Sequence, residues 1–164
     1  MTAQLAGEAA PRPAPVLVAD IHVLGMLGVL RSLGRAGYET HGYSSQGDAL
    51  GLYSRYNRRP VRAPGYDDPG FSDWLLRYLL EHGIRALIPS EALLLALRRR
   101  IEEFRAWLPL LPPAPVVYRC LSKCDVLTSF AAAPDGAAVR RNLPPSVIYD
   151  AGRIPLAADL VVLD

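Results

Sequence analysis

The chain has 164 residues, of which 51% are hydrophobic and 21% charged, a balance typical of a soluble globular domain with a core. Its net charge of +2 and its scattered basic residues argue against nucleic acid as a partner. No apolar run reaches the ~18 residues of a membrane span, so no membrane partner is expected. Residues 1–15 lack signal-peptide regions, which predicts a disordered tail and a cytoplasmic protein.

The first elements predict a βαβ unit. Residues 16–19 (VLVA) form a short apolar run typical of a buried parallel strand. Leucines at helical spacing then lead to Gly37, a helix stop, and residues 38–43 (YETHGY) alternate as a second strand does. A strand, a helix and a strand in this order predict a parallel pair with a right-handed crossover.

The remaining elements continue the alternation of strands and helices. They are a loop over 44–58, an edge strand at 59–62, a helix over 67–83, a strand at 84–89, a helix over 91–108 capped by Ser90, a strand at 112–118 and a helix over 121–132. Residues 134–142 are predicted to be a loop and residues 143–150 to be extended. The sequence therefore predicts an α/β fold, a Rossmann-like three-layer αβα domain with a short parallel sheet over residues 16–133.

Cys120 and Cys124 are four residues apart on the last predicted helix. Adjacent turns of one helix do not give disulfide geometry, and two thiols are half of a usual zinc ligand set. We expect free thiols, buried or half-buried, on one helical face.

Ligands of parallel α/β sheets bind at the carboxyl ends of the strands, which here carry residues 20–25, 44–51, 89–91 and the approach to Lys123. The second strand lacks the terminal acid of a dinucleotide site, which excludes NAD. A P-loop is excluded because the residues before Lys123 do not match its motif. A receiver-like domain would need an acidic cluster, and only Asp20 lies near the end of the first strand.

Lys123 is the only lysine among the eighteen basic residues. One explanation is chance in an arginine-rich sequence. The other is a site that needs a compact ammonium group, as phosphate-binding lysines provide, rather than a planar guanidinium.

The order of these parts resembles the N-terminal region of ATP-grasp enzymes, the pre-ATP-grasp domain. The stretches that carry the resemblance are VLVADIHVLG leading into RSLGRAGYE, YSRY at 53–56, IRALIPSEA at 84–92, and LSKCDVLTSFAAA followed by LPPSVIYD. In the family the last stretch commonly has an Asp-Lys pair that opens a helix, and here Ser122 precedes Lys123. This resemblance implies that residues 134–164 are a linker and the start of an ATP-grasp region that continues past Asp164.

The resemblance also implies roles for particular residues. Lys123 would contact ATP phosphates, and Asp20, Gly25, Arg55 and Glu91 would border the substrate pocket. No catalytic residue and no metal ligand is expected in this chain. The full-length enzyme would use ATP and magnesium to join small carboxylate and amine-type or thiol substrates through an acyl phosphate, and the fragment alone would be inactive.

A stand-alone α/β module that binds a small molecule or a protein without ATP is the alternative. In that case substitution of Lys123 would have almost no effect. The apolar segment LPLLPPAPVV at 108–117 favours self-association, so a homodimer is the expected assembly.

Overall fold

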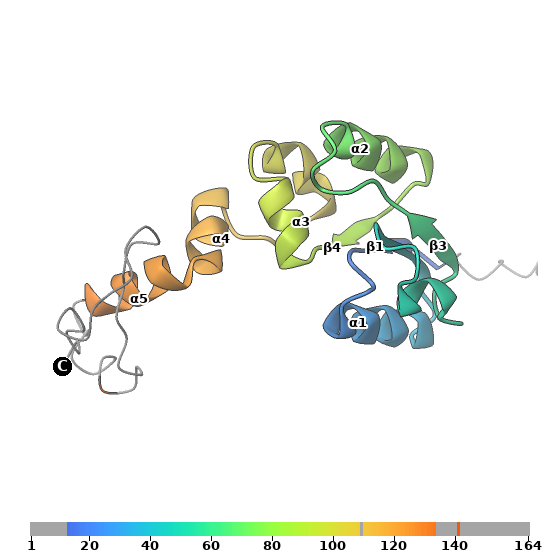
Figure 1. Ribbon diagram of the computed structural model, residues 1–164, viewed down its shortest axis with the longest axis horizontal. Coiled ribbons are helices and arrows are strands. Elements are labelled where there is room, and N and C mark those ends of the chain that lie inside the picture. Colours follow the sequence, from blue (N-terminus) through green and yellow to red (C-terminus); the bar gives the residue numbers. More distant parts are fainter. Residues whose placement is uncertain (1–12, 109, 134–140, 142–164) are drawn as a thin grey trace, which may run out of the picture. The chain divides into compact units, whose positions relative to one another are not determined.

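The computed structural model describes residues 13–108, 110–133 and 141 (Figure 1). The chain divides into two compact units, Met1–Leu111 and Pro112–Asp164. Most of the tail predicted over 1–15 lies outside the described residues, although Pro15 already belongs to the first strand. The linker predicted over 134–164, with its loop and extended segment, also lies outside them apart from Arg141.

The first unit is a four-stranded parallel sheet with order β3-β2-β1-β4. Its elements are β1 (Pro15–Val18), α1 (Leu24–Arg35), β2 (Glu39–Ser44), the 3-10 helix η1 (Leu50–Tyr53), β3 (Arg59–Arg62), α2 (Phe71–Glu81), β4 (Ala86–Ile88), α3 (Glu91–Ala96) and the 3-10 helix η2 (Ile101–Trp107). Helix α1 lies on one side of the sheet and α2 on the other (Figure 1). The predicted Rossmann-like αβα fold is therefore confirmed.

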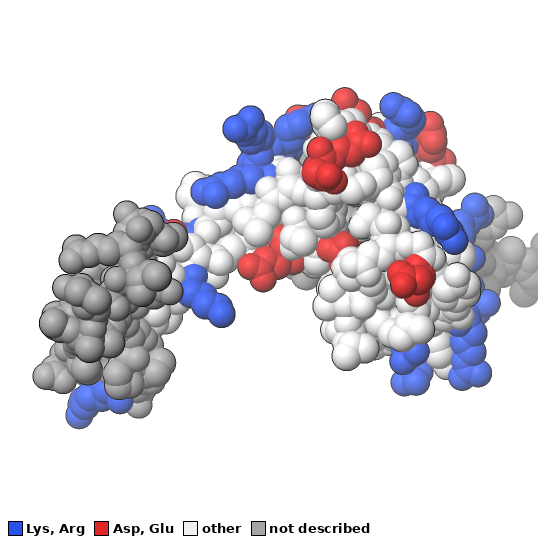
Figure 2. Space-filling view, viewed as in Figure 1, with Lys and Arg blue, Asp and Glu red and all other residues white. Residues whose placement is uncertain are grey.

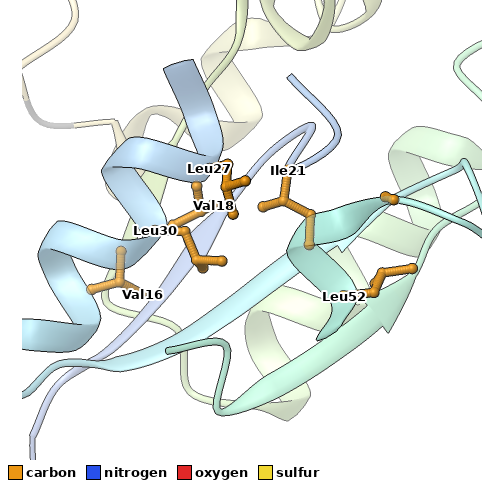
Figure 3. Close-up of a cluster of buried hydrophobic side chains, with 7 residues drawn as sticks. Val16, Val18, Ile21, Leu27, Leu30 and Leu52 are labelled. Atoms are coloured by element: carbon orange, nitrogen blue, oxygen red, sulfur yellow. The ribbon is translucent and has the colours of Figure 1, made fainter. Parts of the chain in front are cut away.

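The central strand β1 is buried on both faces because its side chains alternate. Val16 and Val18 belong to a cluster that packs under α1 (Figure 3). Leu17 points to the other face and is 0% exposed. The cluster under α1 consists of Val16, Val18, Ile21, Leu27, Leu30, Ala49 and Leu52. Burial of each large apolar side chain contributes roughly 1.5–3 kcal/mol, so these contacts fix α1 against the sheet.

A row of aromatic rings fills the face between β2 and α2. The Tyr43 ring lies 6.0 Å from the Trp74 ring and 6.5 Å from the Phe71 ring, measured between centroids. His41 lies two residues before Tyr43 on β2, and its ring packs edge-on against the Tyr78 ring with 5.9 Å between centroids. The His41 Nδ1 also forms a 2.8 Å hydrogen bond with the Tyr78 hydroxyl. These rings bury the alternate side chains of β2 and attach α2 to the sheet.

His41 makes the stability of this face depend on pH. Burial lowers the pKa of His41 below its ordinary value of 6.5, and the hydrogen bond to Glu39 offsets this only in part. Since the unfolded chain then binds a proton more readily than the folded one, the free energy of unfolding should fall as pH drops below 6.5 towards the lower folded pKa. Urea unfolding at about pH 7.5 and about pH 5.5 measures this loss.

The matched variant for this experiment is His41→Gln, which removes the titrating ring and leaves His22 and His82 in place. We expect the variant to lose less stability between the two pH values than the parent chain. Equal losses in both proteins would assign the pH dependence to other groups.

The prediction of a single helix over 91–108 is wrong. This segment is divided into α3 and η2 by a turn in which the Arg100 backbone departs from helical geometry at φ −128°. Arg100 bridges from this turn to Asp73 of α2 at 2.6 Å. Trp107, at the end of η2, donates a 2.8 Å hydrogen bond from Nε1 to the Ile84 carbonyl. These two contacts with distant elements favour the tighter 3-10 turn over a continuous α-helix.

The second unit contains α4 (Ala114–Leu121) and α5 (Lys123–Ala131). The strand predicted at 112–118 is therefore wrong. Pro113 is the N-cap of α4 and Pro115 lies in its first turn, where the missing N–H costs nothing and the fixed φ suits a helix. None of the helices in the described part of the chain combines the length and the hydropathy that a membrane crossing requires.

Ser122 separates the two helices of this unit. Its backbone is extended at φ −97° and ψ 110°, and its hydroxyl caps α5 by accepting a bond from the Asp125 N–H at 3.2 Å. Cys120 and Cys124 therefore lie on different helices, and both thiols are free and exposed. The expectation of a common helical face and of buried or half-buried thiols is corrected by this break.

Candidate functional site

The carboxyl ends of the parallel strands place several polar side chains together. Asp20 follows β1 by two residues, Ser90 follows β4 by two residues, and Ser44 is the last residue of β2. After β1 the chain passes through α1 to β2, which pairs with β1 on one side, and the later strand β4 pairs with β1 on its other side. The order of strands in the sheet therefore changes direction at β1, and such a topological switch point is the usual ligand site of open α/β sheets.

Asp20 is the central residue of this end of the sheet. It is only 3% exposed, and its Oδ2 accepts a 2.7 Å hydrogen bond from the Tyr66 hydroxyl and a second bond from the Ser90 hydroxyl. Its φ of 49° is the only positive value among the described residues that are not glycine. The left-handed conformation costs roughly 1–2 kcal/mol, which the hydrogen bonds of Oδ2 with Tyr66 and Ser90 offset.

The second carboxylate oxygen of Asp20 is available to a ligand. Oδ1 has no hydrogen-bond partner among the residues that the structure describes. Within the same residues, no fully buried side-chain oxygen or nitrogen lacks a partner. Oδ1 is therefore not completely enclosed, although Asp20 is only 3% exposed, and it is an unused acceptor for an amine or hydroxyl group.

A chain of hydroxyl groups holds this carboxylate in place. The Tyr66 hydroxyl bridges Asp20 and the Tyr43 hydroxyl, which lies 3.0 Å from it. Burial raises the pKa of the Tyr66 hydroxyl, and the neighbouring Asp20 raises it further. Burial also raises the pKa of Tyr43. Both phenols thus stay protonated at neutral pH: Tyr66 donates to Asp20, and Tyr43 donates to Tyr66 and holds it in place.

The first turn of α1 borders the same end of the sheet. Its N-cap is Val23, so no side chain caps the helix, and the first turn contains no acidic residue. A side chain at Gly25 would meet no atom within 4 Å, so the backbone at the start of the helix is openly accessible. Beside it, His22 Nδ1 lies 3.1 Å from the Ser44 hydroxyl. This end therefore combines free helix N–H groups with a carboxylate and an imidazole.

Three of the four predicted substrate-binding residues share this end of the sheet. Asp20 follows β1, Gly25 is the second residue of α1, and Glu91 is the first residue of α3. Glu91 is exposed and directly follows Ser90, whose hydroxyl caps α3 through the Leu93 N–H at 3.0 Å. The structure thus groups these three positions around the switch point.

Arg55 lies at the opposite end of the sheet. Its neighbour Tyr56 accepts a hydrogen bond at its carbonyl from Thr40, the second residue of β2. A Cβ on Gly34, near the end of α1, would lie 2.7 Å from the Tyr56 Cβ. Both contacts are at the amino ends of the strands, so the structure does not bring Arg55 to Asp20.

Lys123 is the first residue of α5 in the second unit. Its side chain is exposed and forms no ion pair within the described part of the chain. A cation at a helix N-terminus faces the positive end of the helix dipole, which is unfavourable for stability. The position therefore gives Lys123 no structural role in α5.

Sequence reasoning did not single out Tyr43 or Tyr66. Tyr66 contacts Asp20 across 46 residues, from the loop that follows the edge strand β3. This loop starts at the carboxyl end of β3, as the loops after the other strands start at their carboxyl ends. The position of Tyr66 in this loop is the sequence signal that could have identified it as a site residue. Tyr43 ends the alternating run in YETHGY, a pattern that indicates a strand and no hydrogen-bond partner.

No group of three His, Cys, Asp or Glu side chains lies close enough to hold a metal ion, as far as residues 13–108, 110–133 and 141 are concerned.

No protein-family model matches the chain, and no curated protein shows significant similarity to it.

Proposed function

We propose that the chain is the N-terminal, substrate-side part of a cytoplasmic ATP-dependent ligase of the ATP-grasp type. The observation that carries this proposal is the Asp20 carboxylate at the switch point, held by Tyr66 and Ser90 with Oδ1 left for a ligand. In the proposed enzyme, Asp20 binds the polar end of a small substrate, and Glu91 and the open turn at Gly25 line the surface around it. These residues bind and orient the substrate.

Lys123 supplies the proposed contact to the ATP phosphates. Its ammonium group is exposed at the first residue of α5, so it adds to the attraction of the helix N–H groups for an anion. A lysine has no stabilising effect at this end of a helix, which favours a role in ligand binding. Its three rotatable donors suit a triphosphate better than the fixed fork of arginine does.

Magnesium has no ligand set within the described residues. The proposal therefore assigns the metal ligands and the adenine contacts to a further part of the enzyme. When bound, ATP would supply the phosphoryl group that activates the substrate carboxylate, and magnesium would neutralise the charge of the transferred phosphate. The described residues contribute substrate binding at Asp20 and phosphate binding at Lys123.

Lys123→Met in the native gene product tests this function. We expect the KM for ATP to rise, or kcat to fall, by about tenfold or more, because a charged hydrogen-bond donor to phosphate is lost. The assay follows phosphate release from ATP with a panel of small carboxylates and amines. Circular dichroism should show unchanged folding, since the Lys123 side chain is exposed and unpaired among the described residues.

Arg119→Ala is the matched control, because Arg119 is an exposed basic residue of α4 in the same unit. It removes one positive charge, as Lys123→Met does, and should leave the kinetics within about twofold of the parent enzyme. If Lys123→Met also leaves them unchanged, Lys123 does not bind ATP. An absence of ATP turnover in the parent enzyme with every substrate pair would favour the stand-alone binding module.

A further inference from the structure

Two guanidinium groups converge on one tyrosine at the amino end of the sheet. The Arg55 Cζ lies 4.8 Å and the Arg35 Cζ 5.4 Å from the centroid of the Tyr56 ring. The Arg55 Nη2 donates a 2.7 Å hydrogen bond to the Tyr56 hydroxyl. Hydrogen bonds from Arg35 and Arg55 lower the pKa of this phenol. We call Arg35, Arg55 and Tyr56 the arginine patch.

The tyrosine of the arginine patch is held in a fixed position. Its carbonyl accepts a hydrogen bond from Thr40 of β2. Gly34 of α1 has no side chain, and a Cβ there would lie 2.7 Å from the Tyr56 Cβ and 2.8 Å from the Tyr56 carbonyl oxygen. Glycine therefore permits the close approach of α1 that brings Arg35 to the ring. The patch is built from contacts of α1 and β2, so its geometry does not depend on the exposed side chains alone.

No carboxylate of the described residues neutralises the positive charge of the patch. Neither Arg35 nor Arg55 pairs with a carboxylate of the described residues. Arg100, by contrast, pairs with Asp73 and Glu103 at 2.6 Å each. Figure 2 shows basic side chains gathered over β3 and the C-terminal end of α1. Two like charges held together without a counterion attract an external anion.

The exposure and composition of the patch suit a protein partner. Arg35 and Arg55 are exposed, Tyr56 is half-buried, and the neighbouring Tyr53 is 74% exposed. Arginine and tyrosine dominate the energetic centres of protein interfaces. The Tyr56 hydroxyl accepts a hydrogen bond from the Arg55 guanidinium, so its own proton remains free for a carboxylate of the partner. Small-molecule sites are usually more enclosed than such an open surface.

We propose that the arginine patch is a docking surface for an acidic segment of a partner protein. Carboxylates of that segment bind the Arg35 and Arg55 guanidinium groups in bidentate geometry and accept a hydrogen bond from the Tyr56 hydroxyl. The patch lies at the end of the sheet opposite Asp20, so partner and substrate can bind together. This assignment is independent of the proposed ligase activity.

Fluorescence anisotropy of a fluorescein-labelled hexaglutamate peptide tests the docking surface with the full 164-residue chain. At about 10 mM ionic strength the Debye length is about 30 Å, which strengthens exposed charge pairs. We expect binding that weakens about tenfold or more in Arg35→Ala/Arg55→Ala, because both charge-assisted bonding groups are removed. The control Arg77→Ala/Arg99→Ala removes the same charge from exposed positions outside the patch and should change the affinity less than twofold.

Three results would overturn the proposal. They are an absence of peptide binding, equal losses in the two double variants, and tighter binding of a DNA duplex of equal charge that is lost in the patch variant. The second result would indicate attraction by net charge alone, and the third would indicate a nucleic-acid surface. Thermal unfolding followed by circular dichroism shows whether each variant is folded before its affinity is compared.

Discussion

Gly51→Ala is expected to lower the free energy of unfolding by about 3 kcal/mol, because overfilling a packed core costs about 1–3 kcal/mol and sometimes more. A Cβ at this position would lie 2.5 Å from both the Cβ and the carbonyl oxygen of Ile21. Ile21 is 0% exposed and its N–H is bonded to the Tyr43 carbonyl at 3.2 Å, so it has no room to move. Urea unfolding measures the loss.

Gly28→Ala is the matched control for this substitution. A Cβ at Gly28 meets no atom within 4 Å, and the residue lies inside α1. Alanine in a helix interior is more stable than glycine by roughly 0.5–1 kcal/mol, so this variant should be as stable as the parent chain or more so. A comparable loss in both variants would show that the clash with Ile21 is not the cause.

Asp20→Ala is expected to lower the free energy of unfolding by about 3 kcal/mol. The left-handed backbone at φ 49° costs alanine roughly 1–2 kcal/mol, and the loss of a buried acceptor costs roughly 1–3 kcal/mol. The Tyr66 and Ser90 hydroxyls would both lose their bond to Oδ2. The same urea titration compares this variant with the parent chain.

Asp20→Asn separates the structural role of this residue from its proposed role in binding. Asparagine tolerates the left-handed region and keeps an acceptor oxygen, so stability should change by less than about 1 kcal/mol. In the proposed enzyme the same variant should raise the KM for the small substrate and leave the KM for ATP unchanged, since the charge at the switch point is lost. Equal destabilisation by alanine and asparagine would contradict the role of the backbone conformation.

The sheet was the most predictable part of the molecule. The strand predicted at 59–62 has the bounds of β3, Arg59–Arg62, and it lies at the edge of the sheet as Pro60 requires. The apolar run of β1 and the glycine stops after α1 and α2 are also confirmed, with φ of 90° at Gly37 and 58° at Gly83. Each of these signals acts through residues close in sequence, which a reading of the chain can follow.

The errors fall where local signals conflict. Val116 and Val117 favour a strand, but Pro115 suits the first turn of a helix, and a short apolar run does not decide between them. The break after α3 depends on Arg100 reaching Asp73 of another helix, 27 residues earlier in the chain. Propensity alone contains no information about such a partner.

The candidate site was predictable as a location and not as a network. Asp20 and Ser90 were found at strand ends, since chain order fixes which residues follow each strand. The bond between them spans 70 residues, and the tyrosine bridge to Tyr66 depends on how the loop after β3 returns over the sheet. The role of Arg55 in substrate binding follows from the resemblance of the YSRY stretch alone, and this motif does not reveal that its loop approaches the amino ends of the strands.

The distribution of tryptophan has a spectroscopic consequence. Both tryptophans, Trp74 and Trp107, belong to the first unit, where Trp74 packs 5.6 Å from the Tyr78 ring and Trp107 bonds to the Ile84 carbonyl. Tryptophan emission, excited at wavelengths that tyrosine does not absorb, thus follows the first unit alone on denaturation, whereas far-ultraviolet ellipticity also includes α4 and α5. Coincident transitions by the two probes mean that the units unfold cooperatively, and separated transitions mean that they are independent.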